Sequence, residues 1–195
     1  MREFKDSLPC KASEIIYKNN IKVRFFSYGE TGFGLMTSPG KRITLSGVRP
    51  VGLIQRTFEN YYIYGAGDVA DGENFFPEFS NMNTDCLQCF IDEFSKHFQN
   101  IMNIMLIDSA GIHKAERLVI PENIRLIFLP PYSPDLNPIE RFWQYIKKDT
   151  KGKIFFGIPE MKDCAADILK KCSSKTTASL TGFSYILDAI NGLLQ

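Results

Sequence analysis

Two short apolar segments in the second half of the chain constrain the fold more than any other feature. They cover Asn103 to Asp108 and Ile124 to Leu129, and turn-forming residues bound the second one at Pro130-Pro131. Runs of this length are typical of strands in a buried sheet. A helical pattern precedes the pair and another follows it, so the order of elements predicts an α/β fold.

Further elements follow from turn residues and apolar spacing. Strands are expected at 23–28, 57–66 and 74–79, and the loop 32–52 has room for a short strand at Ile43 to Leu45. Helices are expected after an N-cap at Thr84, with apolar positions through Phe98, and near 159–171 and 179–193. We find no repeat and no linker, so the chain is expected to form a single domain over residues 1–195.

Composition indicates a soluble globular protein. The chain has 195 residues, is 44% hydrophobic, and carries 23 Lys and Arg against 22 Asp and Glu, for a formal net charge of +1. A chain of this size needs no disulfides, so the five cysteines, including the C-x-x-C pair Cys86 and Cys89, are expected to be reduced thiols. The apolar runs are too short to cross a bilayer, and no signal peptide is evident. We therefore expect a cytoplasmic protein with no membrane partner.

Two carboxylates lie where metal ligands are common. Asp108 ends a strand, and Glu140 is in the first turn of a later helix, for which Asn137 is the expected N-cap and Pro138 the first residue. This layout can bring both carboxylates to one edge of the sheet. Hard cations such as Mg²⁺ or Mn²⁺ prefer oxygen ligands of this kind. Acidic residues at strand ends are common, however, so spacing alone leaves a structural role open.

The segment Leu-Pro-Pro-Tyr-Ser-Pro-Asp-Leu-Asn-Pro-Ile-Glu-Arg-Phe-Trp, from Leu129 to Trp143, resembles a signature of the DDE superfamily transposases. An upstream segment, Leu-Ile-Asp-Ser-Ala-Gly-Ile-His-Lys from Leu106 to Lys114, extends the match to the bacterial insertion-sequence branch related to the mariner elements. The resemblance covers about residues 20–150 and leaves 151–195 as C-terminal helices. It implies a ribonuclease H-like mixed β-sheet flanked by helices. It also implies that three carboxylates hold two Mg²⁺ or Mn²⁺ ions to cut and join DNA.

By this resemblance, Asp108 corresponds to the second catalytic carboxylate and Glu140 to the third, and both are expected to bind metal. The first should be the Asp of an Asp-Glu pair in the opening strand, but here the chain reads Gly29-Glu30. Gly29 therefore stands at the position of the missing Asp. Successive strand residues point to opposite faces, so Glu30 could substitute only if the backbone bulged or twisted. Catalysis is expected to be impaired, since losing a metal-bridging carboxylate lowers the rate by orders of magnitude.

Basic residues follow the third carboxylate. Residues 141–175 hold nine Lys or Arg against four acids, which suits a path for the DNA backbone, although a solvated helix face explains them almost as well. The loop residues Lys41, Arg42 and Arg49 are a second candidate. The candidate DNA contacts are His113, Lys114, Arg141, Lys147, Lys148 and Lys151. His113 could instead steady the metal site.

Family members usually carry a helix-turn-helix region before the catalytic domain, and only about twenty residues precede the first strand here. A two-frame element, a truncated remnant and a catalytic fragment are the three explanations. The leading hypothesis is an insertion-sequence transposase catalytic domain that acts on double-stranded DNA ends and forms a homodimer on DNA. The alternatives are a non-catalytic DNA-binding remnant and a ribonuclease H-like nuclease with another substrate, such as a branched or hybrid duplex.

Overall fold

The computed structural model describes residues 2–19, 22–37, 43–49, 51 and 54–193. Its strands are β1 (Val23–Gly34), β2 (Asn60–Asp68), β3 (Asn74–Phe75), β4 (Glu78–Phe79), β5 (Met102–Ile107) and β6 (Ile124–Phe128). Its α-helices are α1 (Arg2–Asn19), α2 (Thr84–His97), α3 (Ile139–Lys148), α4 (Ile158–Lys171), α5 (Ser174–Thr181) and α6 (Ser184–Leu193). Two short 3₁₀ turns, η1 (Gly111–Lys114) and η2 (Pro134–Leu136), complete the elements.

The strands form one mixed sheet in the order β3, β2, β1, β5, β6, and β4 also pairs with β2. β1 runs antiparallel to β2 and parallel to β5, which in turn runs parallel to β6. Parallel neighbours need a crossover connection, and α2 lies in the connection that leads to β5. The mixed sheet with helices packed on it confirms the predicted α/β class.

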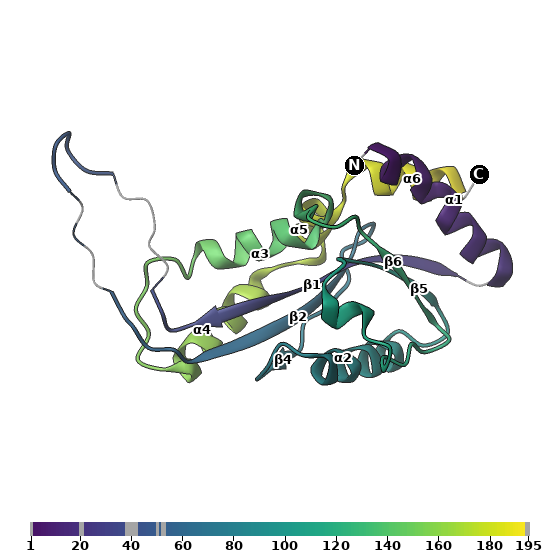
Figure 1. Ribbon diagram of the computed structural model, residues 1–195. Helices are drawn as coiled ribbons and strands as arrows, with labels where there is room; N and C mark the ends of the chain where they lie inside the picture. The colour runs from purple at the N-terminus through teal and green to yellow at the C-terminus, as the bar shows by residue number, and fades with distance from the viewer. Residues whose placement is uncertain (1, 20–21, 38–42, 50, 52–53, 194–195) are drawn as a thin grey trace.

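Helices cover both faces of the sheet, with α3 on one side of β1 and β2 and α2 on the other (Figure 1). Side chains of β1 alternate between these faces. Phe26 and Tyr28 pack in the cluster with α2, whereas Phe33 packs in the cluster with Phe142 and Trp143 of α3. Consecutive residues of β1 therefore face different helices, which decides what each can reach.

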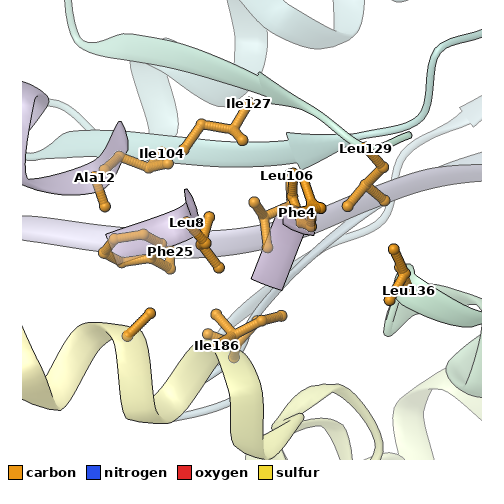
Figure 2. Close-up of a cluster of buried hydrophobic side chains, with 12 residues drawn as sticks. Phe4, Leu8, Ala12, Phe25, Ile104, Leu106, Ile127, Leu129, Leu136 and Ile186 are labelled. Atoms are coloured by element: carbon orange, nitrogen blue, oxygen red, sulfur yellow. The ribbon is translucent and has the colours of Figure 1, made fainter. Parts of the chain in front are cut away.

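The helices α1 and α6 lie side by side and cover a third cluster (Figure 1). Figure 2 shows Leu8 of α1 and Ile186 of α6 beside Phe25 and Leu106 of the sheet. No helix was predicted before β1. The spacing of Phe4, Leu8 and Ala12 is helical, but Pro9 lies within the helix and interrupts the usual sequence signal.

Several predicted boundaries differ from the structure. β1 was expected to end at Tyr28, but it continues to Gly34, because the glycines that suggested a turn are ladder residues of a strand. The N-cap of α2 is Asn83, whose side chain accepts from the Cys86 N–H, and not Thr84. The helix expected over 179–193 is two helices, separated at Gly182.

Residues 43–49, a described part of the connection between β1 and β2, lie away from the sheet (Figure 1). Residues 43–45 do not form the short strand allowed by the sequence, and Ile43 and Leu45 are exposed. Arg49 in this connection is exposed as well, whereas Lys41 and Arg42 lie outside the described residues. Of these three predicted DNA contacts, the structure therefore describes Arg49 alone.

The five cysteines are free thiols, as predicted. Among the described residues, no helix combines the length and apolar character needed to span a bilayer.

Candidate active site

The site lies where α3 rests directly on β1 and β2. Gly29 of β1 is the antiparallel partner of Gly65 of β2. A Cβ on Gly29 would lie 2.7 Å from Cγ2 of Ile139 and 3.5 Å from Nε1 of Trp143. A Cβ on Gly65 would lie 2.5 Å from two carbons of the Trp143 ring. The paired glycines thus allow α3 to approach the sheet more closely than any residue with a side chain would.

The strand β1 also fixes where α3 begins. Ser27 Oγ accepts a hydrogen bond from the Ile139 N–H at 2.9 Å and donates to Asn137 Oδ1 at 2.6 Å. Asn137 Nδ2 in turn donates to the Tyr28 carbonyl at 2.8 Å. The prediction that Asn137 is the N-cap was wrong by one residue, since the cap position is Pro138. Asn137 binds β1 instead, and a serine from the strand supplies the acceptor that a capping side chain normally provides.

Asp108 follows the last residue of β5. The parallel register pairs Ser27 with Leu106, and continuing it by two residues sets Gly29 beside Asp108 on the face that α3 covers. The Asp108 side chain is 48% exposed. Its Oδ1 accepts from the Ala110 N–H at 2.7 Å and lies 2.7 Å from Nδ1 of His113. Oδ1 of Asp108 is therefore held in place, whereas Oδ2 has no hydrogen-bond partner among the described residues.

His113 is buried between two carboxylates. Its Nδ1 faces Asp108 Oδ1, and its Nε2 lies 2.8 Å from Oε1 of Glu30, which also accepts from the Tyr28 hydroxyl at 2.6 Å. Burial disfavours the charged ring, but the hydrogen bonds to Asp108 and Glu30 outweigh it and raise the pKa of His113 to about 10. The bond from His113 is also the main reason that the pKa of Asp108 is lowered. The ring is thus positively charged at neutral pH.

Glu30 is not brought to the position of the missing Asp. The ladder between β1 and β2 continues without a bulge through Gly29 and Glu30, which pair with Gly65 and Tyr64. Glu30 therefore keeps the face of Tyr28 and bonds to His113, on the opposite side of the strand from α3. Glu30 could replace the missing Asp only if a bulge or twist of the β1 backbone moved its side chain to the other face. The continuous ladder shows no such change.

Asp108 and Glu140 line one cavity of about 410 Å³, together with Asn137 and the proline-rich segment 130–134. Burial raises the pKa of Glu140, and the negative charge of Asp108 raises it further. Among the described residues, the Glu140 carboxylate has no hydrogen-bond or ion-pair partner. The structure thus brings Asp108 and Glu140, the two carboxylates singled out from the sequence, to one cavity. Asp108 is held through Oδ1, whereas Glu140 is not held by any described residue.

The donor set suits one hard divalent cation. Asp108 and Glu140 offer oxygen ligands at an open cavity, which is what Mg²⁺ or Mn²⁺ prefers. Within the described part of the chain, no group of three or more His, Cys, Asp or Glu side chains is placed to hold a metal ion. A two-ion centre with three protein carboxylates does not fit, because position 29 carries no side chain.

Trp143 of α3 is buried against Phe76 and Phe142. Its Nε1 has no hydrogen-bond partner among the described residues. This donor lies beside Gly29, where a carboxylate side chain would accept its hydrogen. Sequence reasoning missed this donor and the role of Ser27, because both depend on the distance between α3 and β1.

The basic residues predicted to contact DNA lie on several elements of the structure. Lys147 and Lys151 line a second cavity at the C-terminal end of α3. Lys114 lines a third cavity, along β6. Arg141 and Lys148 are exposed on α3.

A family profile described as DDE superfamily endonuclease matches residues 25–160. A relative from Sinorhizobium fredii (strain NBRC 101917 / NGR234), the uncharacterized protein y4pE/y4sA, is 33% identical over 87 residues, which are 44% of this chain and 64% of that protein. The matched region therefore spans less than two thirds of that relative.

Three solved structures of Mos1 share the fold. The mariner paired end complex with Mn has a TM-score of 0.67 at 12% identity over 91% of this chain and 57% of the Mos1 chain. The strand transfer complex has a TM-score of 0.64 at 12% identity, over 98% and 59% of the two chains. The catalytic domain of Mos1 mariner transposase has a TM-score of 0.57 at 11% identity, over 90% and 84%.

These similarities confirm the ribonuclease H-like fold that the sequence predicted. The family profile begins in β1 and ends in α4. The matched residues therefore include Gly29, Asp108 and Glu140. Because that profile covers more than half of the residues, this chain belongs to the DDE superfamily of endonucleases.

Proposed function

We propose that this protein is the catalytic domain of an insertion-sequence transposase that cleaves and transfers DNA strands, with activity reduced by Gly29. The observation that carries the proposal is the convergence of Asp108 and Glu140 in one cavity beside Gly29. Their position in a DDE-family fold is the second support.

Asp108 and Glu140 would hold a Mg²⁺ or Mn²⁺ ion, which supplies Lewis-acid stabilisation of charge at a phosphodiester. His113 and the Ala110 N–H fix Oδ1 of Asp108, so Oδ2 is the oxygen that would be left to bind a cation. Among the described residues the Glu140 carboxylate has no hydrogen-bond or ion-pair partner. Its pKa is raised first by burial and further by the charge of Asp108, so keeping both carboxylates ionised has an energetic cost. A divalent cation would remove that cost.

Gly29 limits the chemistry of the site. With no carboxylate at position 29, the protein cannot bridge two ions with three side chains. Losing that ligand is expected to reduce transition-state stabilisation by several kcal/mol, and each ~1.4 kcal/mol corresponds to a tenfold loss in rate. Cleavage is therefore expected to be slow.

Double-stranded DNA is the proposed partner. Mos1, which shares the fold, is described in a strand transfer complex and in a paired-end complex with the left transposon end. A homodimer that pairs two DNA ends is part of the same proposal.

The test is nicking of supercoiled plasmid in Mn²⁺, followed over hours. Slow nicking by the unchanged chain should be lost in Asp108→Asn and in Glu140→Gln. The control is Asp135→Asn. Asp135 is an exposed acid in the turn segment between β6 and α3, and its variant should nick the plasmid at the rate of the unchanged chain. If Asp108→Asn nicks as fast as the unchanged chain, the assignment of the metal ligand is wrong.

The second candidate function is a DNA-binding remnant that cuts no strand. It is favoured by the position of Ile139, whose Cγ2 lies 2.7 Å from the place where a Cβ at position 29 would be. This packing leaves no room for the missing carboxylate side chain. Duplex binding without Mn²⁺-dependent nicking in any variant would support it over the first.

A further inference from the structure

The strand β6 lies at one end of the sheet, beside β5 (Figure 1). The two strands are parallel, and along such a pair alternate residues direct both of their backbone groups toward the neighbouring strand. The carbonyl of Asn123 and the N–H of Leu129 both bond to residues of β5. The backbone groups of Leu126 and Phe128, at the alternate positions, therefore point away from the sheet.

This outer edge of β6 is unpaired in the described part of the chain. Neither Leu126 nor Phe128 has a backbone hydrogen-bond partner there on the side away from β5. Two N–H donors and two carbonyl acceptors thus lie along one open edge. An edge of this kind is a template on which another extended chain can pair.

The third cavity, of about 500 Å³, borders the same edge. Its apolar lining comes from β6 and from the segment after η1, and includes the half-buried side chains of Leu118, Ile120 and Leu126. Side chains of a strand alternate between the two faces of a sheet. Every second side chain of a segment paired with β6 would therefore point into this apolar cavity.

The charge at this cavity is positive. Lys114 and Arg125 line it and are exposed, whereas no Asp or Glu does so. Neither cation forms an ion pair with another described residue. Arg125 Nη1 donates to the neutral carbonyls of Glu122 and Ile124, and the Lys114 ammonium lies 5.5 Å from the centre of the Phe128 ring. A complementary partner therefore carries negative charge.

The combination of groups distinguishes between possible occupants. A second copy of this edge would bring its own Lys114 and Arg125 against these two, and like charges across paired strands are destabilising. A DNA strand would neutralise the cations but has no backbone amides to pair with the N–H and carbonyl groups of β6. An acidic polypeptide in the extended conformation satisfies both the charge and the open edge.

We propose that β6 and the cavity beside it bind an extended segment of another protein, which adds to the sheet as a strand with alternating apolar and acidic side chains. The apolar side chains would fill the cavity. Arg125 alternates with Leu126 along β6, so its side chain begins on the opposite face, where the acidic side chains would point. This inference goes beyond the proposed function and does not depend on DNA cleavage.

The test is fluorescence anisotropy of a labelled synthetic peptide with the full chain. The peptide has about six residues, the usual length of a strand, and alternates valine with glutamate. It should bind, whereas a peptide that alternates valine with lysine should not. Lys114→Gln and Arg125→Gln should each weaken binding about two- to fivefold, as expected for exposed charge pairs. Lys171→Gln, at an exposed lysine of α4, makes the same charge change and should have no effect.

Methylation of the peptide nitrogens tests the added strand without altering the protein. Successive N–H groups of a strand point to opposite edges, so methyl groups on the valine nitrogens block one edge and those on the glutamate nitrogens block the other. One methylated peptide should lose about tenfold or more in affinity, because several hydrogen bonds are lost together. The other should bind like the unmethylated peptide.

Three results would overturn the proposal. The first is failure of the glutamate peptide to bind, or equal binding of the two methylated peptides. The second is displacement of the peptide by a DNA duplex whose own binding is weakened by Lys114→Gln and Arg125→Gln, since the surface would then serve DNA. The third is a dimer in sedimentation that Phe128→Pro, which removes an outward N–H, converts to a monomer, since a second copy would then occupy the edge.

Discussion

Helix α3 lies so close to Gly29 and Gly65 that neither position has room for a side chain. Ile139 and Trp143 already occupy the volume that side chains at those positions would need. The Trp143 indole N–H is buried and finds no partner in the described part of the chain, and an unpaired buried donor costs about 1–3 kcal/mol. A carboxylate at position 29 would satisfy this donor but would also displace Ile139. The local packing therefore opposes the chemistry that the family fold would otherwise support.

Gly65→Ala should lower the free energy of unfolding by about 1–3 kcal/mol, because its Cβ would meet the Trp143 ring at 2.5 Å and Phe76 at 2.7 Å. Urea denaturation measures the change. Gly111→Ala is the control, since a Cβ there meets nothing within 4 Å. Equal stability of the two variants would contradict the close approach of α3.

His113 should make stability depend on pH. Its pKa is raised from 6.5 to about 10 on folding, so its contribution is fully present below pH 6.5 and is lost as the pH rises through about 10. In EDTA, the Tm of the unchanged chain should fall more steeply between pH 7 and 10 than that of His113→Gln. His97→Gln, at an exposed histidine, should follow the unchanged profile. Parallel profiles for all three proteins would show that His113 is not charged by its neighbours.

At the scale of elements, β1 organises the site through its alternating faces. Ser27 and Gly29 face α3 and set where the helix begins and how closely it lies. Tyr28 and Glu30 face the other side and bond to each other, and Glu30 bonds to His113. A single strand thus positions Glu140 through one face and Asp108, by way of His113, through the other.

Ser27→Ala should destabilise the protein by about 1–2 kcal/mol, because the Ile139 N–H and Oδ1 of Asn137 both lose their partner. It should also weaken Mn²⁺ binding, since Glu140 is the residue after Ile139. Thermal unfolding and calorimetry measure the two effects, with the exposed Ser179→Ala as control. A loss of stability with unchanged Mn²⁺ affinity would argue against the idea that Ser27 positions Glu140 by binding the Ile139 N–H.

At the scale of the whole molecule, the first and last helices of the described chain, α1 and α6, pack together. Helix α1 also packs on the sheet face beside α3, so residues far apart in the sequence complete one core (Figure 2). Leu8→Ala should cost about 2–5 kcal/mol, because Leu8 is fully buried in this cluster. Cys10→Ala, on the exposed side of the same helix, should be near neutral in the same denaturation experiment. A small effect of Leu8→Ala would mean that α1 is dispensable for the fold.

The sequence predicted the α/β class, a strand leading up to and ending at Asp108, and the helix that carries Glu140, because apolar runs and turn residues are local signals. The strand itself ends one residue earlier, at Ile107. The sequence did not predict α1, whose helical spacing is interrupted by Pro9, or the continuation of β1 through its glycines. Those glycines look like turn residues until the packing of α3 is known. The link from Ser27 to Ile139 depends on tertiary contact and has no local signal.

The central claim is that Asp108 and Glu140 form a metal site left incomplete by Gly29. Calorimetric titration with Mn²⁺ tests it most directly, using the unchanged chain, Ile139→Ala, and Ile139→Ala combined with Gly29→Asp or with Gly29→Asn. Ile139→Ala makes room for the new side chain, and Asn reproduces the shape of Asp without its charge. We predict that only the Asp variant gains about tenfold or more in affinity, or a second ion. Equal binding by all four proteins would contradict the claim.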